Sequence, residues 1–126
     1  MNSIYLFGIA SQRNTWLAVR QETITSNIAH ANTPGYRARD VQPFAEVLQA
    51  IRPDMAASDP GHLQDSSAYG GGDAVTNEAA WHTSESGNSV SIERELVKSG
   101  EVNAAFSLNN GVIKAFHRML LTSTKV

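Results

Sequence analysis

The chain changes character within the stretch SNIAHANTPGY, residues 26–36. The residues before it contain no proline, and their only glycine is Gly8, near the start. Positions every seven residues form one column of a helical seam, and a second column is offset by three or four positions. These seam positions are Phe7, Ala10, Asn14, Leu17, Gln21, Ile24, Ile28 and Ala31. The sequence therefore predicts one long helix over residues 3–32 that packs along a mostly apolar seam.

The second half of the stretch predicts a rigid corner. Thr33 precedes a proline, which disfavours helical geometry at that residue. Pro34 and Gly35 suit the second and third positions of a type II turn, whose third residue needs a positive φ. Tyr36 then places a large aromatic side chain just beyond the corner. Residues 33–42 are thus expected to form a turn and elbow, which is either a simple helix stop or an interaction surface.

A second helical pattern occupies residues 89–123. Its seam positions alternate at spacings of three and four residues. They are Val102, Phe106, Asn109, Ile113, Phe116 and Leu120. Gly100 and the run Asn109-Asn110-Gly111 weaken the pattern, because glycine disfavours a helix interior and Asn-Gly often marks a turn. One long helix is predicted, and a division into two or three shorter helices stays open.

The region between these helices is expected to be mostly irregular. Residues 43–52 begin with proline and place apolar side chains on one helical face, which indicates a short helix. Residues 53–88 are rich in Gly, Ser, Asp and Ala, which predicts a flexible loop. The predicted fold is mainly α, within a single domain over residues 1–126. Its long N- and C-terminal helices pair as a coiled-coil-like hairpin, accompanied by a short third helix and a long irregular central loop.

Composition argues against several function classes. A formal net charge of -2 supplies no basic surface for nucleic acid. The chain contains no cysteine, which excludes disulfides, thiolate metal ligands and cysteine nucleophiles. The N-terminus lacks the pattern of a cleavable signal peptide, and no apolar run is long enough to span a membrane.

Residues suited to catalysis or metal binding are scattered. The histidines are His30, His62, His82 and His117, and none has a zinc-site spacing to another. Glu93 and Glu95 lie two positions apart and face different sides of a helix, so helix capping and solvation suit them better than paired acid–base work. We therefore expect no catalytic, cofactor-binding or metal-binding residues and no enzyme activity.

Two segments resemble a known family. Residues 27–36, NIAHANTPGY, resemble the N-terminal signature of flagellar rod, hook and related axial proteins, commonly written NIANAxTPGY. His30 stands where asparagine is common. Residues 87–91, GNSVS, followed by Glu93 and Glu95, are similar to the family's entry into its C-terminal helix. The short length is most like that of proximal rod proteins, and the C-terminus lacks the EMxxMI and YEAN runs of the FlgC, FlgF and FlgG types.

The resemblance implies a structural subunit of the bacterial flagellar basal body. Family members assemble helically into a hollow rod that crosses the periplasm, transmits torque and surrounds the export channel. They leave the cell through the flagellar type III export apparatus without a cleaved signal peptide. The implied partners are further copies of the chain, rod proteins of the FlgC, FlgF and FlgG types, the adaptor FliE and the MS-ring protein FliF. Neither nucleic acid nor direct membrane insertion is implied.

The residues expected to contact neighbouring subunits come from the elbow and the C-terminal helix. They are Asn27, Ile28, Asn32, Thr33, Pro34, Gly35, Tyr36, Val102, Phe106, Ile113, Phe116 and Leu120. Polar seam residues Asn14, Gln21 and Asn109 are expected to set register at some loss of stability. Because two helices cover their apolar stripes only partly, the monomer is expected to be marginal and to become fully helical on assembly. Two alternatives stay open: another short flagellar axial protein of the rod, and a small helical export adaptor or chaperone.

Overall fold

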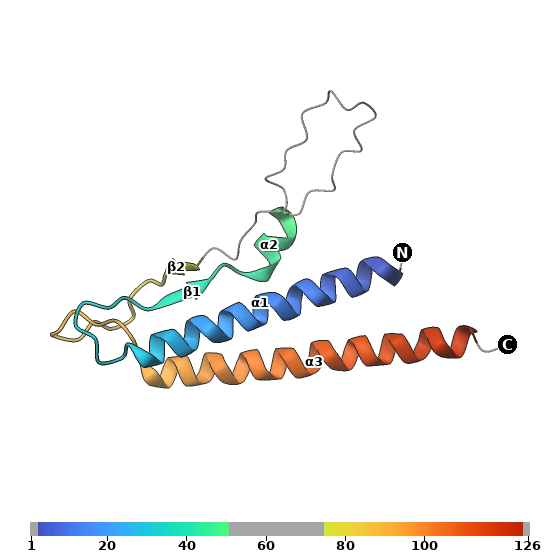
Figure 1. The fold of residues 1–126 in the computed structure, drawn as a ribbon. Helices are drawn as coiled ribbons and strands as arrows, with labels where there is room; N and C mark the ends of the chain where they lie inside the picture. Colours follow the sequence, from blue (N-terminus) through green and yellow to red (C-terminus); the bar gives the residue numbers. More distant parts are fainter. Residues whose placement is uncertain (1–2, 51–74, 125–126) are drawn as a thin grey trace, which may run out of the picture.

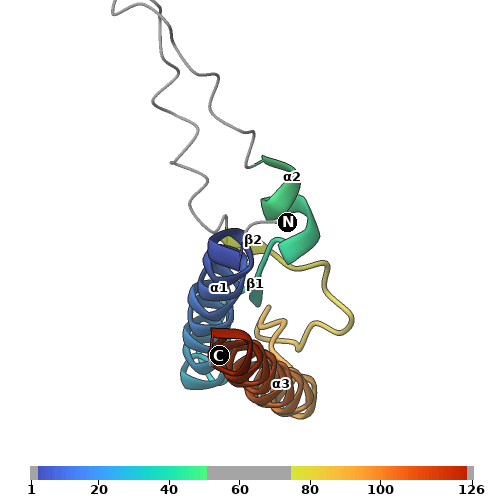
Figure 2. The same ribbon diagram turned by 90° about the vertical axis from the view of Figure 1, so that its right-hand side faces the viewer.

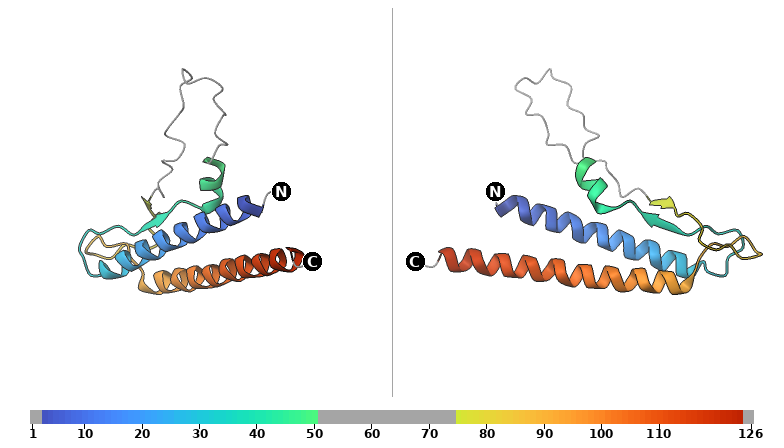
Figure 3. Two further views of the ribbon diagram at one scale, coloured as in Figure 1. Left: turned by 45° about the vertical axis from the view of Figure 1, so that its right-hand side comes forward. Right: turned by 180° about the vertical axis from the view of Figure 1, so that it is seen from behind.

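The computed structural model, which describes residues 3–50 and 75–124, is built around two long helices. Helix α1 spans Ser3–Ala29 and helix α3 spans Ile92–Thr124. They lie side by side and run in opposite directions, so that the start of α1 and the end of α3 occupy the same end of the molecule (Figures 1 and 3). With 33 residues, α3 is about 50 Å long. It continues through Gly100 and Gly111, which confirms the prediction of one long helix over its division.

Three short elements lie between the long helices in the chain. They are β1 (Arg39–Val41), α2 (Phe44–Ala50) and β2 (Val75–Asn77). The two strands pair antiparallel, with Arg39 opposite Asn77 and Val41 opposite Val75. Seen along the long helices, β1 and α2 lie beside α1 (Figure 2). The chain therefore leaves the hairpin after α1, returns through β2 and then enters α3.

The core occupies the part of the hairpin nearer the elbow. Leu17 and Ile24 of α1 are buried against Val102 of α3, at the seam positions that the sequence pattern indicates. Trp16 closes this core on the strand side, where its ring packs on Phe44 at 5.8 Å between centroids. The indole Nε1 donates a hydrogen bond to the Gln42 carbonyl at 2.8 Å, which satisfies the one polar atom of the ring. The core thus includes the strand and α2 as well as the two long helices.

The mainly helical fold is confirmed, while the predicted boundaries differ in detail. Helix α1 ends at Ala29 instead of residue 32, because the next backbone groups bond within a turn that precedes the proline. Both strands were missed: β1 lies in the predicted elbow over 33–42, and β2 in the predicted loop over 53–88. Three-residue strands carry too little alternation to be recognised in a sequence. The remainder of that predicted loop, with His62, lies outside the described residues.

Candidate functional site at the elbow

In the structure we call residues 30–38 the elbow, in place of the predicted range 33–42. A second segment, residues 84–91, braces the elbow, and we call it the return loop. Gly35 N donates to Ser86 O at 2.9 Å, and Ser89 N donates to Tyr36 O at 3.0 Å. Ala38 N also donates to the hydroxyl of Ser89, at 2.9 Å. The corner is therefore a pair of bonded segments that move together, although they are about 50 positions apart in the sequence.

Two glycines make this pairing possible. Gly35 has a φ of 72° and Gly87 a φ of 80°, which are left-handed values that favour glycine. Tyr36 N donates to Thr33 O at 3.3 Å, which closes the turn predicted from the sequence. A Cβ built on Gly87 would lie 3.5 Å from the Gly35 Cα, at ordinary contact distance. The backbone conformation, more than the available space, thus restricts both positions to glycine.

Asn88 of the return loop caps the end of α1. Its Nδ2 lies 2.8 Å from His30 O, 2.9 Å from Ala31 O and 2.8 Å from Thr33 O. These carbonyls follow the last helical turn, where the backbone lacks helical partners. Asn88 Oδ1 accepts a hydrogen bond from Val90 N at 2.8 Å. One buried amide therefore joins the end of α1 to the approach to α3.

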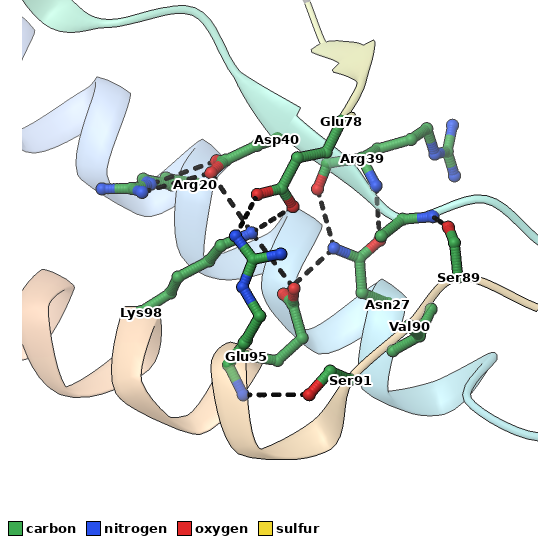
Figure 4. A network of polar contacts seen from close by, with 12 residues as sticks. Arg20, Asn27, Arg39, Asp40, Glu78, Ser89, Val90, Ser91, Glu95 and Lys98 are labelled. Carbon is green, nitrogen blue, oxygen red and sulfur yellow. Dashed lines mark hydrogen bonds and ion pairs between the residues drawn. The ribbon is translucent and has the colours of Figure 1, made fainter. Parts of the chain in front are cut away.

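Asn27 connects three elements from a fully buried position. Its Nδ2 donates to Arg39 O at 2.7 Å and to Glu95 Oε2 at 3.0 Å. Its Oδ1 accepts hydrogen bonds from Arg39 N at 3.0 Å and from the Tyr36 hydroxyl at 3.3 Å. The amide thus links α1, β1 and α3 in one network, and Figure 4 shows it between β1 and Glu95. Because both ends of the amide are bonded, its orientation is fixed.

A charge cluster continues this network. It consists of Arg20, Asp40, Glu78, Glu95 and Lys98, drawn in Figure 4. Lys98 Nζ contacts Glu95 Oε1 at 3.1 Å, Asp40 Oδ2 at 3.4 Å and the carboxylate of Glu78. Arg20 holds Asp40 with two bonds of 3.1 and 3.2 Å. The ammonium group therefore ties α3 to both strand segments, and Arg20 ties β1 to α1.

Two members of the cluster, Asp40 and Lys98, have shifted pKa values that favour their charged forms. Burial of Asp40 acts to raise its pKa, but hydrogen bonds from Arg20 and Val41 N, with the positive charges of Arg20 and Lys98, outweigh it and lower the pKa. Burial of Lys98 acts to lower its pKa, but hydrogen bonds to Glu78 and Glu95 and the carboxylate charges outweigh it and raise the pKa. Asp40 and Lys98 therefore stay charged in the folded chain at neutral pH. Among the described residues, every buried side-chain N or O atom has a hydrogen-bond partner.

The predicted contact residues separate into two groups. Asn32, Thr33, Pro34 and Gly35 are exposed at the elbow, where Tyr36 is half-buried. Ile28, Ile113, Phe116 and Leu120 are half-buried and Phe106 is 44% exposed. Asn27 and Val102 lie inside the chain, at 0% and 4% exposure. The structure therefore gives these last two intrachain contacts, and leaves the elbow and part of α3 accessible.

The sequence reasoning missed most of the charge cluster. Glu95 was expected to cap the helix and to be solvated, yet it is only 1% exposed and bonds Asn27 and Lys98. One local signal existed, because Glu95 and Lys98 are three positions apart on a helix. Asp40 and Glu78 carry no such signal, since only the strand pairing brings them to Lys98.

His30 has a packing contact in the elbow. Its ring is stacked on Tyr36, with centroids 4.6 Å apart and planes inclined by 7°. Its Nδ1 lies 2.8 Å from Ser26 O, one helical turn earlier.

Within residues 3–50 and 75–124, no group of three histidine, aspartate or glutamate side chains is placed to hold a metal ion. Over the same ranges, none of the helices is both long and apolar enough to cross a membrane.

The described residues thus form a long hairpin with a braced corner and a polar network in which every buried side-chain N and O atom has a partner. The family model described as Flagella basal body rod protein matches residues 8–37, which include most of α1 and the elbow. The flagellar basal body rod protein FlgB of Agrobacterium fabrum (strain C58 / ATCC 33970) is 42% identical over 131 residues, covering 99% of this chain and 96% of that protein. The chain belongs to the flagellar basal-body rod protein family. This confirms the resemblance noted in the sequence and the expectation of a structural rod subunit.

Proposed function

We propose that the chain is a FlgB-type subunit of the proximal rod. Copies assemble helically with one another and with other rod proteins into a hollow rod that transmits torque and surrounds the export channel. The identity to a FlgB protein over nearly the whole chain supports the place in the rod. The observation that supports assembly is a second apolar face on α3, which α1 does not cover.

This second face, the outer stripe, consists of Val97, Ala104, Leu108, Ala115 and Met119. Their spacings of seven, four, seven and four place them on one side of the helix. Val97 is 63%, Leu108 67% and Met119 60% exposed. Exposed apolar side chains that line up in this way are typical of interaction surfaces. The stripe therefore suits a helix of a neighbouring subunit.

The elbow supplies a contact surface of a different kind. Asn32, Thr33, Pro34 and Gly35 are exposed, and the return loop holds their backbone in one conformation. A surface that is ordered before binding loses little conformational entropy on association. Packing of one copy's stripe on a different surface of the next copy generates an open helical array. We therefore assign the exposed elbow residues, with Ile28, Tyr36, Phe106, Ile113, Phe116 and Leu120, to contacts between subunits.

Asn27 and Val102 are buried within the chain, so we assign them an indirect role: they position the surfaces that contact neighbouring subunits. Asn27 fixes the elbow relative to α3, and Val102 fixes α3 against α1. The proposed partners are further copies, FlgC-, FlgF- and FlgG-type rod proteins, the adaptor FliE and the MS-ring protein FliF. The proposed role is non-enzymatic, in a rod that crosses the periplasm after export without a cleaved signal peptide.

Photo-crosslinking in assembled basal bodies tests this function. A photoreactive amino acid at Leu108, on the outer stripe, is expected to crosslink to another copy or to a neighbouring rod protein. The same probe at Asn103, an exposed position on another face of α3, is the matched control and is expected to give little product. Exclusive crosslinking of Leu108 to one soluble client, with no product in basal bodies, would favour the export adaptor instead.

A further inference from the structure

Three asparagines form one hydrogen-bonded cluster in the seam between the long helices. Asn109 Nδ2 donates to Asn14 Oδ1 at 2.7 Å and to Ala10 O at 2.8 Å. Asn14 Nδ2 donates to Asn110 Oδ1 at 3.0 Å. All three side chains are half-buried. We call Asn14, Asn109 and Asn110 the asparagine cluster. Both polar groups of Asn14 are bonded within it, and these bonds form only when Asn14 lies opposite Asn109 and Asn110.

Apolar contacts alone leave α1 with a choice of partner surfaces. α3 carries an inner face, which packs on α1, and the outer stripe, which remains exposed. Burial of apolar area is non-directional, so it does not by itself distinguish these two surfaces. Nor does burial of apolar area distinguish the α3 of the same chain from the α3 of a second copy. A directional contact is needed to make one pairing preferred.

The cluster discriminates against shifted registers. In the observed pairing, Asn109 contacts Asn14 while Phe116 packs edge-on against Phe7. A shift of one heptad in one direction would place Asn14 opposite Val102 and Asn109 opposite Phe7. The opposite shift would place Asn14 opposite Phe116. In either case the half-buried amide of Asn14 loses its amide partner, which carries a free-energy cost.

The cluster also discriminates between the two faces of α3. The residues of the outer stripe have no hydrogen-bonding side chains, and the one polar side chain between Val97 and Ala104 on that side of α3 is the exposed Glu101. An α1 helix from another copy that packed on this stripe would bury the Asn14 Oδ1 without a donor, because a carboxylate only accepts hydrogen bonds. The inner face, with Asn109 and Asn110, supplies both a donor and an acceptor to that amide.

We propose that the asparagine cluster selects the partner of α1: it directs α1 to the inner face of its own α3, in one register, and keeps the outer stripe free for another molecule. A polar residue at a seam position has this effect in coiled coils, where it lowers stability and fixes the pairing. The proposal goes beyond assembly into a rod, because it concerns pairing within one chain and holds whatever the chain later binds.

The test replaces the cluster with leucines in the full chain, as Asn14→Leu/Asn109→Leu. The chain has no cysteine of its own, so introduced pairs report the pairing. Gln21→Cys with Ser99→Cys reports the observed register, in which these side chains are 3.1 Å apart. Gln21→Cys with Ile92→Cys reports a shift of one heptad. After oxidation in a glutathione buffer, non-reducing gels and mass spectrometry separate disulfides within one chain from disulfides between chains.

With the native asparagines, the 21–99 disulfide within one chain is expected to dominate. In the leucine variant, shifted or interchain disulfides are expected to rise about tenfold, since no amide opposes the alternatives. The urea midpoint is expected to be unchanged or higher, because the apolar seam is no less stable than the polar one. Gln12→Leu/Asn103→Leu adds the same two leucines at exposed positions off the seam and is expected to keep the native distribution.

Two results would overturn the proposal. A native disulfide distribution in the leucine variant would show that apolar packing alone selects the partner. Loss of the helical circular dichroism signal would show that the asparagines are needed for folding itself, and not for the choice between pairings.

Discussion

The two halves of the α1–α3 hairpin are held together differently. In the elbow half, Leu17, Ile24 and Val102 are buried together, and Asn27 and the charge cluster bond the long helices to the strands. In the terminal half, the contacts are the asparagine cluster and the edge-on pair of Phe7 and Phe116, with centroids 6.2 Å apart. Neither β1 nor β2, the strands of the part of the chain that the structure describes, lies over α1 there (Figure 1).

The buried hydrophobic cluster follows the same division, whereas exposed apolar side chains, such as Val97 at 63%, occur in both halves. Every residue of the buried hydrophobic cluster of the described chain lies between the asparagine cluster and the elbow or in β1. In the terminal half, Tyr5 is 63%, Met119 60% and Leu121 53% exposed. Since local stability follows buried contacts, the elbow half is expected to fold within one chain and the terminal half to depend on neighbours. The prediction of a marginally stable monomer therefore applies to the terminal half of the hairpin.

The largest effect is expected for Glu95→Ala. It removes one of the three carboxylates that contact Lys98 and one of the two acceptors of Asn27 Nδ2. Removal of one member of a buried pair typically costs about 3–5 kcal/mol, and because Glu78 and Asp40 still contact Lys98 and Arg39 O still accepts from Asn27, the expected loss is about 3 kcal/mol. Urea unfolding of the monomer followed by circular dichroism measures this cost. Glu93→Ala, two positions earlier and exposed, is the control and is expected to leave the urea midpoint nearly unchanged. Similar midpoints for the two variants would remove the distinction between the halves.

A smaller loss is expected for Gly35→Val. A β-branched residue at a φ of 72° is strained, at a cost of about 2 kcal/mol. The strain is expected to displace the elbow and abolish swimming in soft agar while export of the unassembled chain continues. Gly8→Ala, in α1 with nothing within 4 Å of the added Cβ, is the control and is expected to stabilise the helix slightly. Normal swimming of the valine variant would count against the elbow as a subunit contact.

Phe116→Ala, in the terminal half, is expected to cost the monomer about 1 kcal/mol, since the ring is only half-buried and loses one aromatic contact. Hydrogen exchange is expected to show faster opening near residues 112–120 and unchanged protection around Ile24. Loss of protection throughout both long helices would indicate that the hairpin unfolds as one unit.

The smallest effect is expected from a change of pH near neutrality, because Asp40 and Lys98 both stay charged there. Because folding lowers the pKa of Asp40, its contribution is fully present above the ordinary value of 3.8 and is lost as pH falls through the folded pKa below it. Because folding raises the pKa of Lys98, its contribution is present below the ordinary value of 10.5 and is lost as pH rises through the higher folded pKa. The contribution of these two groups to stability is therefore expected to be constant between these limits, as measured by thermal unfolding across pH.

Asp40→Asn separates the acidic limb from other carboxylates. The variant is expected to be less stable at neutral pH and to lose less further stability on acidification than the native chain. An unchanged acidic limb would show that Asp40 does not contribute to it.

The parts of the fold that were predicted rest on local patterns. Leu17 and Ile24 recur with the heptad and are buried as expected, and Pro34-Gly35 forms the expected turn. The contacts that were missed join distant positions. Nothing near Asn88 indicates that its amide meets Ala31, because that contact exists only once the return loop lies beside the elbow. Local sequence thus predicts the helices and the corner, while their bracing depends on tertiary pairing.

The bracing of the elbow has a consequence for how the family can change in size. Because the elbow and the return loop are bonded to each other and Val41 pairs with Val75, the chain between β1 and β2 is an excursion whose two ends lie together. Lengthening such an excursion adds only loop-closure entropy, about 0.6 kcal/mol for each doubling. We therefore expect insertions between α2 and β2 to leave the pairing of α1 and α3 unchanged, whereas insertions within β1 or α2 would disturb the core.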